Sequence, residues 1–187
     1  MFLYDALYNR LLFARWRVQC REFPRINGRV MIADFTPNGE GGTVRIGRKV
    51  VINSALWANP VGGVRTVFLF KGAGAVIEID DGAGMSNVLL AAFSSVYIGR
   101  NVNLGAGVKV FDNDFHSLDY EERMADRNLK SAPVRIEEGA FIGSDAIIMK
   151  GVTVGARSVI GAGAIVTKSV PPGEIWGGNP AKLIRKL

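Results

Sequence analysis

Residues 136–166, IEEGAFIGSDAIIMKGVTVGARSVIGAGAIV, decide the fold. Branched aliphatic residues recur there at every sixth position: Ile136, Ile142, Ile148, Val154, Ile160 and Val166. Four positions after each of these comes a small or modest residue: Ala140, Ala146, Val152, Ser158, Ala164 and Val170. Half of the positions three residues after each aliphatic are glycine, which suits a turn that needs positive φ. A period of six fits neither an α-helix nor a simple strand alternation.

This period predicts a β-helix. One hexapeptide supplies a short strand and a corner, and three make one triangular coil whose aliphatic side chains point inward. Stacked coils pair as parallel strands and bury their apolar faces only against one another. Shorter tracts of the same kind include Ile46 with Ile52 and, further on, Ile98, Leu104 and Val110. We therefore expect coils from residue 44 to residue 172.

Three other segments flank or interrupt these coils. Residues 1–43 are expected to be a helical capping segment, and residues of about 112–133 an excursion loop that leaves the coils and returns. Residues 173–187 form a tail, in which Pro180 is expected to begin a short helix.

The first 23 residues, MFLYDALYNRLLFARWRVQCREF, predict an amphipathic helix. Four arginines, Arg10, Arg15, Arg17 and Arg21, interrupt the apolar residues, so no run approaches the roughly 18 needed to span a membrane. The segment also lacks the pattern of a signal peptide, and a cytoplasmic location is expected. The helix either docks on the body of the protein or a neighbouring subunit, or makes weak peripheral contact with an anionic membrane.

Composition narrows the classes of partner and cofactor. The chain has 187 residues, which fits one domain, and a net charge of +6. That charge suits nucleic acid, an anionic membrane or a phosphate-rich small molecule, but no basic and aromatic module for nucleic acid is visible. One cysteine and one histidine leave no disulfide framework and no zinc cluster, so no metal is expected.

The single histidine, His116, lies in FDNDFHSLD at residues 111–119. A lone histidine is more often an idle surface residue, but this one falls in a loop between two repeat tracts, where sites are commonly built on rigid scaffolds. A neutral imidazole, with an ordinary pKa of about 6.5, can take the proton of an attacking hydroxyl. The neighbouring Asp112, Asp114 and Asp119 either orient the ring or are solvated loop carboxylates.

Two stretches resemble the hexapeptide-repeat acyltransferases, especially the galactoside, maltose and surface-polysaccharide O-acetyltransferases. They are residues 112–134, DNDFHSLDYEERMADRNLKSAPV, and residues 140–187, which end in the distinctive GNPAK followed by an arginine. The resemblance implies an all-β fold, a left-handed parallel β-helix, with His116 as the catalytic base and acetyl-CoA as co-substrate. It also implies a homotrimer whose sites lie between subunits.

The resemblance assigns further residues by position. It places an oxyanion-binding backbone N–H at Ser144, and contacts with the pantetheine arm and phosphates of coenzyme A at Ala162, Thr167, Lys168, Lys182 and Arg185. It suggests that Asn87 and Asp114 bind the acceptor, although Asn87 equally suits a turn in a coil corner. Trp57 could stack on a sugar or pack on the early coils.

These assignments predict an O-acetyltransferase that moves an acetyl group from acetyl-CoA to a hydroxyl of a sugar or glycan precursor. A xenobiotic acetyltransferase is the alternative that differs only in its acceptor. A non-catalytic hexapeptide scaffold would need neither the histidine-bearing loop nor the basic tail. A three-histidine zinc enzyme on the same scaffold is excluded, because the chain has one histidine.

Overall fold

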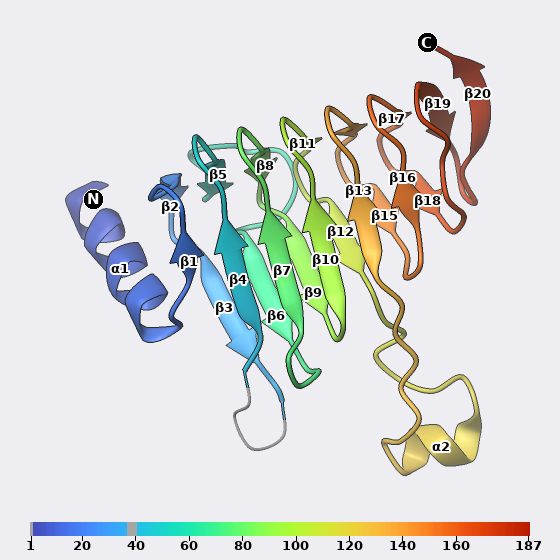
Figure 1. Ribbon diagram of the computed structural model, residues 1–187, viewed down its shortest axis with the longest axis horizontal. Coiled ribbons are helices and arrows are strands. Elements are labelled where there is room, and N and C mark those ends of the chain that lie inside the picture. Colours follow the sequence, from blue (N-terminus) through green and yellow to red (C-terminus); the bar gives the residue numbers. More distant parts are fainter. Residues whose placement is uncertain (1, 37–40) are drawn as a thin grey trace.

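Short strands stack in triangular coils along one axis, and a helix lies across the first coil (Figure 1). The computed structural model describes residues 2–36 and 41–187. Within those residues each of the six coils contributes one strand to each of three sheets, named A, B and C.

Up to β18 the strands of each sheet follow one another at intervals of three along the chain, and β19 and β20 then extend sheet B. Sheet A holds β1 (Gln19–Cys20), β4 (Thr43–Ile46), β7 (Val76–Ile79), β10 (Ser95–Ile98), β13 (Val134–Ile136) and β16 (Thr153–Val154). Sheet B holds β2 (Arg25–Gly28), β5 (Val51–Ser54), β8 (Gly84–Ser86), β11 (Asn103–Leu104), β14 (Phe141–Ile142), β17 (Val159–Ile160), β19 (Glu174–Gly177) and β20 (Lys182–Lys186). Sheet C holds β3 (Met31–Asp34), β6 (Val67–Phe70), β9 (Leu89–Ala92), β12 (Lys109–Phe111), β15 (Ile147–Ile148) and β18 (Ile165–Val166).

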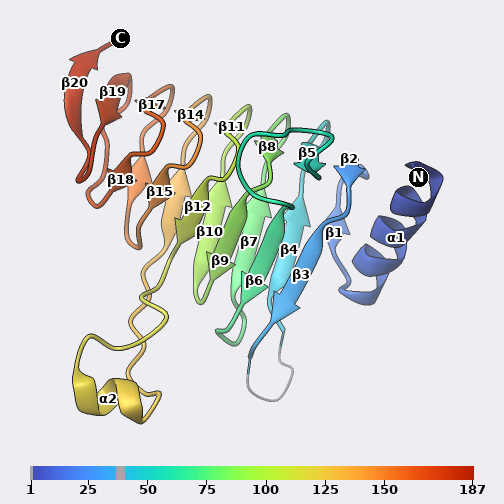
Figure 2. The same ribbon diagram turned by 180° about the vertical axis from the view of Figure 1, so that it is seen from behind.

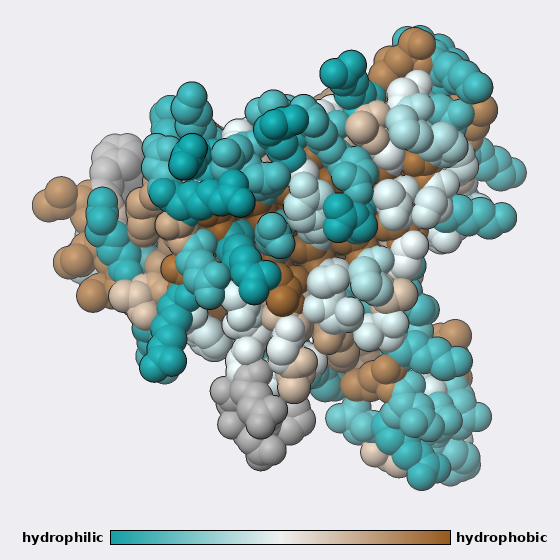
Figure 3. All heavy atoms as spheres, in the orientation of Figure 1, coloured by the Kyte–Doolittle hydropathy of each residue, from teal (hydrophilic) through white to brown (hydrophobic). Residues whose placement is uncertain are grey.

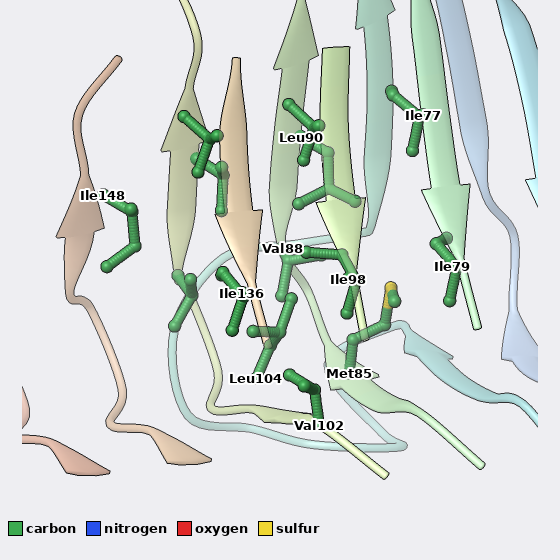
Figure 4. Close-up of a cluster of buried hydrophobic side chains, with 14 of the residues drawn as sticks. Ile77, Ile79, Met85, Val88, Leu90, Ile98, Val102, Leu104, Ile136 and Ile148 are labelled. Carbon is green, nitrogen blue, oxygen red and sulfur yellow. The ribbon is translucent and has the colours of Figure 1, made fainter. Parts of the chain in front are cut away.

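The six-residue period sets the register between coils. Ile136 pairs with Val154 in sheet A, Ile142 with Ile160 in sheet B, and Ile148 with Val166 in sheet C, always in parallel. All six of these side chains are completely buried. Figure 4 shows aliphatic side chains of successive coils gathered in the interior of the stack.

The corner positions agree with the predicted small and positive-φ slots. The small-slot residues from Ala140 to Val170 are all buried. Three residues after each aliphatic, the backbone has positive φ at Gly139, Asp145, Gly151, Arg157 and Gly163. Asp145 and Arg157 take this conformation without being glycine, so stacking of the coils outweighs the local strain of about 1–2 kcal/mol.

The coils begin earlier than residue 44. Cys20, Ile26 and Ile32 occupy the inward positions of the first coil and pair with Ile46, Ile52 and Phe68 of the second. A cysteine in place of the first aliphatic leaves only two residues in register, too few to detect as a repeat. Residues 37–40, within the predicted capping segment, lie outside the described residues.

The predicted short C-terminal helix is wrong. Residues Lys182–Lys186 form β20, which runs antiparallel to β19. Pro180 lies in the turn between the two strands rather than at a helix start. The N–H of Ala181 donates to the Ile165 carbonyl (2.8 Å) and that of Leu187 to the Gly173 carbonyl (2.8 Å), so the open edge of the coils captures these backbone donors.

The predicted N-terminal helix is present as α1 (Phe2–Arg15). Its Asp5, Asn9 and Phe13 are buried against the first coil. No helix among the described residues has the length and apolar character needed to cross a membrane.

Candidate active site

The excursion loop leaves the coils at the edge where sheet C meets sheet A, between β12 and β13, and projects from the stack (Figure 1). Its two ends form a short antiparallel stem. Asn113 bridges to Ser131, the Asp114 N–H donates to the Lys130 carbonyl (3.2 Å), and the Ala132 N–H donates to the Asp112 carbonyl (2.8 Å). The stem holds the loop at both ends, so the residues beyond it start from a fixed position.

Phe115 links this stem to His116. Its φ is +59°, a conformation that costs a bulky residue energy and persists only where the surroundings impose it. Here the Phe115 N–H donates to Asn113 Oδ1 (2.8 Å). Its ring packs edge-on against Phe93 and Phe111, with centroids 5.8 and 5.4 Å away. The aromatic cluster therefore holds the backbone turn from which the histidine projects.

The His116 side chain is exposed, and its ring makes no hydrogen bond to any described residue. Its backbone N–H donates to the Asp114 carbonyl (2.6 Å), which tightens the turn. The imidazole is thus held on a defined backbone with both ring nitrogens open to another molecule.

Asp112 does not touch the histidine ring. It is completely buried, and its carboxylate accepts the N–H groups of Phe93 (2.8 Å) and Ser94 (2.7 Å) and the Asn113 amide (3.0 Å). Burial raises the pKa of Asp112, against the lowering effect of these hydrogen bonds. Its role in the chain is to fasten the stem to the corner between β9 and β10.

Asp114 pairs with Lys150, a residue that the sequence analysis missed. Lys150 follows β15 at the same edge of the stack, one coil beyond Asp112, so the ion pair ties the loop to the next coil. The pairing of Val110 with Ile148 places residues 112 and 150 at equivalent corners, which was the available signal. The Asp114 carboxylate, which was predicted to bind the acceptor, is therefore already paired with Lys150 of its own chain.

Asp119 also has a local partner. It caps α2 (Tyr120–Met124) by accepting the Glu122 N–H on its side chain (2.9 Å). Glu122 accepts the hydroxyl of Ser117 (2.6 Å) and the amide of Asn128 (2.7 Å), and these bonds lower its pKa. Within the described chain, none of the carboxylates of these three aspartates bonds to the His116 ring.

Ser144 and Ala162 lie at the other edge of sheet C, where it meets sheet B. They occupy equivalent corners of successive coils, and a Cβ added to Gly143 would come 2.5 Å from the Ala162 nitrogen. Within the described residues, neither the Ser144 nor the Ala162 N–H donates to a backbone or side-chain acceptor. These corners present unused backbone donors, the groups that an oxyanion or an amide carbonyl requires.

The predicted basic contacts divide between the two edges. Lys182 pairs with Gly177, which continues the column of Gly143 and Gly161, one residue before the corners of Ser144 and Ala162. Arg185 lies opposite Ile175 on the exposed β20. Thr167 and Lys168 follow β18 at the other edge, beyond Lys150. All four side chains are exposed.

Asn87 is buried (3% exposed) with a φ of +50°. Its amide donates to the carbonyls of Asn59 (2.9 Å) and Gly62 (3.1 Å). Through these bonds Asn87 fastens the loop between β5 and β6, and its role in acceptor binding stays a prediction. Trp57, in that loop, is 46% exposed and lies beside Val64 and Arg65 around a shallow hollow next to α1.

His116 and Ser144 are thus not brought together by one chain. The loop that carries His116 leaves one edge of sheet C, while the Ser144 corner precedes β15 at the opposite edge (Figure 2). A site that uses both residues needs them to meet across sheet C or between copies of the chain.

Known proteins share this architecture. Residues 133–168 match the family described as the hexapeptide repeat of succinyl-transferase. Galactoside O-acetyltransferase of Escherichia coli is 37% identical over 54% of this chain and 49% of its own length. A hexapeptide-repeat-containing acetyltransferase of Vibrio cholerae is 25% identical, with a TM-score of 0.60 over 98% of this chain and 81% of its own. The same Vibrio protein solved with acetyl coenzyme A has a TM-score of 0.59 over 98% of this chain and 78% of its own, at 24% identity.

These findings confirm the predicted resemblance to hexapeptide-repeat acyltransferases and the left-handed parallel β-helix. The chain spans about half the length of the curated relatives it matches.

Proposed function

We propose that this protein is an acetyl-CoA-dependent O-acetyltransferase that acts on a hydroxyl of a sugar or glycan precursor. The observation that carries the proposal is the His116 imidazole, which is exposed and has no hydrogen-bond partner in the described part of the chain, on a loop whose stem, aromatic cluster and ion pair fix its backbone. The galactoside specificity in the name of the Escherichia coli relative supports a sugar acceptor.

The reaction needs one base and one oxyanion donor. The His116 imidazole takes the acceptor's hydroxyl proton while that oxygen attacks the thioester carbonyl and a C–O bond forms. The negative charge on the carbonyl oxygen is stabilised by the Ser144 N–H. The C–S bond then breaks, the carbonyl re-forms, and the leaving thiolate takes the proton from the imidazolium. The products are an O-acetyl ester and coenzyme A.

The open donors along the edge between sheets B and C suit coenzyme A. In this proposal the Ala162 N–H binds an amide carbonyl of the pantetheine arm, and Thr167, at the opposite edge of sheet C, reaches the arm across that sheet or from a neighbouring copy. Lys168, Lys182 and Arg185 contact the phosphates, since exposed cations pair readily with pyrophosphate. The complex of the structurally similar Vibrio acetyltransferase with acetyl coenzyme A supports this donor.

A homotrimer would complete the site. Sheet C carries an outward row that is mostly apolar: Met31, Val67, Leu89, Lys109, Ile147 and Ile165. The equivalent row of sheet A holds Arg45, Glu78, Tyr97 and Arg135, which suits water. If the edge carrying His116 in one copy meets the edge carrying Ser144 in the next, base and oxyanion donor face each other. Light scattering tests the size of the assembly.

A thiol-release assay tests the activity. Acetyl-CoA is mixed with a panel of sugars, nucleotide sugars and aminoglycoside- or streptogramin-type drugs, and the freed thiol is measured. His116→Ala is expected to lower turnover on the preferred acceptor about 100-fold or more, because general-base catalysis contributes roughly that factor. Leu118→Ala, two positions along and 86% exposed, is the matched control and should retain turnover.

Three outcomes count against the proposal. Near-normal turnover of His116→Ala would show that His116 is not the catalytic base. Turnover with drugs alone favours a xenobiotic acetyltransferase. Absence of both turnover and coenzyme A binding favours a non-catalytic scaffold.

A further inference from the structure

The outer face of α1 is an apolar ridge made of Leu3, Leu7 and Leu11. These residues recur at every fourth position, so they line one side of the helix. They are 88%, 55% and 64% exposed. In Figure 3 hydrophobic atoms project from the α1 end of the molecule, away from the strands. Contiguous exposed apolar residues of this kind mark a contact surface.

The inner face of α1 explains why the leucines point outward. Asn9 is completely buried; its amide donates to the Gly28 carbonyl (2.8 Å) and its carbonyl oxygen accepts the Val30 N–H (3.1 Å). Asp5 pairs with Arg29 (2.7 Å). On this inner face Asn9 therefore satisfies backbone groups at the end of the coils, and Asp5 binds an arginine side chain there. The usual arrangement of a surface helix, apolar inward and polar outward, is inverted along much of its length.

Arginines border the ridge. Arg10 and Arg15 lie on α1, and Arg17 and Arg21 follow it; all four are exposed. Residues 1–29 contain six arginines against Asp5 and Glu22, which is +4 of the chain's net +6. Arg21 pairs with Asp80 and Asp81, and Arg29 with Asp5, so the positive charge beside the exposed leucines comes from Arg10 and Arg15.

This charge decides between two occupants of the ridge. A second copy docked ridge to ridge would bring two sets of arginines together and repel. A lipid surface has apolar acyl chains beneath anionic headgroups, so it would accept the leucines and the arginines at the same time. Interfacial helices bind bilayers in this way.

We propose that α1 docks the protein on an anionic lipid surface, with Leu3, Leu7 and Leu11 inserted at the level of the acyl chains and Arg10 and Arg15 among the headgroups. This contact uses none of the residues of the acyl-transfer site, so it stands or falls separately from the proposed function.

Vesicle co-sedimentation tests the proposal. The full chain is spun with vesicles of phosphatidylcholine alone and with vesicles that also contain phosphatidylglycerol. We expect it to pellet with the second and to be released by high salt, because screening weakens the arginine contacts. Leu3→Gln/Leu7→Gln/Leu11→Gln, which keeps good helix formers in α1, should partition at least tenfold less. Arg10→Gln/Arg15→Gln should lose the preference for phosphatidylglycerol.

The matched control is Ile184→Gln/Leu187→Gln on the far end of the stack. These side chains are 64% and 65% exposed and also lie among basic residues. If the protein bound vesicles only by nonspecific adsorption, both variants would therefore lose binding equally. Circular dichroism verifies that each variant folds. The proposal is overturned if wild type does not pellet, if the control loses binding as the leucine variant does, or if the leucine variant changes the size of the assembly, which would make the ridge a protein interface.

Discussion

The coils of residues 134–170 and the excursion loop of residues 112–133 are ordered by opposite means. In the coils, completely buried aliphatic side chains and parallel backbone pairing repeat without interruption. In the loop, few side chains are buried, and order comes from polar bonds. Those of Asn113, Asp119 and Glu122 lie within the loop, and those of Asp112 reach the corner between β9 and β10. The difference teaches that one set of residues determines stability and another determines where His116 lies.

The largest expected effect tests the coil side of this comparison. Ile148→Ala removes a completely buried side chain between two coils. It should lower the free energy of unfolding by about 2–5 kcal/mol, because a buried cavity adds to the lost transfer energy. Leu118→Ala in the loop should change it by less than about 0.5 kcal/mol, since that side chain is exposed. Denaturant unfolding measures both.

Equal losses for the two variants would break the comparison, because they would mean that the loop is part of the cooperative core. A loss confined to Ile148→Ala with unchanged turnover at low temperature would sharpen it.

The next effect concerns the junction of the two regions. Asp112→Ala leaves the Phe93 and Ser94 N–H groups without their acceptor at a buried corner. Unpaired buried donors cost about 1–3 kcal/mol, so unfolding should become easier by that amount. Turnover should fall further than stability explains, because the stem that carries His116 loses its anchor.

Asp119→Ala is the control for this prediction, since it removes a helix cap in the exposed part of the loop. It should cost about 1 kcal/mol or less and leave the stem in place. If Asp119→Ala lowers turnover as much as Asp112→Ala does, the stem is not what positions the histidine.

This contrast also explains what could be predicted from the sequence. The hexapeptide period determines the coils, because each inward residue must stack on the one three repeats later. The first coil escaped detection because Cys20 replaces an aliphatic. The C-terminal strand escaped it because Pro180 also suits a helix start, whereas the bonds of Ala181 and Leu187, on either side of β20, reach carbonyl groups outside the hairpin. Long-range backbone pairing of that kind leaves no local pattern.

The site was predictable in part. The loop and His116 follow from the break in the repeat, but the partners of the aspartates do not. Asp112 bonds to a corner 18 or more residues earlier in the chain, and Asp114 to Lys150 on the next coil. Such contacts depend on which corners stack above one another, and this becomes clear only once every coil has been assigned.

The pH dependence of stability provides a smaller test at the same junction. Burial raises the pKa of Asp112 above its ordinary value of 3.8. Between the ordinary and the raised pKa, the folded protein binds more protons at this group than the unfolded chain does. The contribution of Asp112 to the free energy of unfolding therefore decreases as pH rises through that window.

Asp112→Asn lacks this titration and keeps the other acidic groups. The stability of wild type relative to Asp112→Asn should therefore decrease as pH rises from just below 4, as measured by thermal unfolding at closely spaced pH values. The opposite slope would mean that the N–H bonds from Phe93 and Ser94 outweigh burial at this carboxylate.

The smallest expected effect lies wholly within the loop. Glu122→Gln keeps one acceptor oxygen but removes the negative charge of the carboxylate, which accepts the Ser117 hydroxyl and the Asn128 amide. Because Glu122 is only partly buried and its side-chain bonds lie within the loop, the unfolding temperature should change little. Hydrogen exchange should instead accelerate at residues 117–128, since local opening costs less.

Acid should reproduce this effect in the wild type. The hydrogen bonds hold the pKa of Glu122 below its ordinary value, so the ordering it provides is present above that ordinary value and is lost as pH falls through the lowered one. Exchange in the loop should then approach that of Glu122→Gln while the coils remain protected. Unfolding of the coils together with the loop, in either experiment, would show that the two regions are not ordered independently.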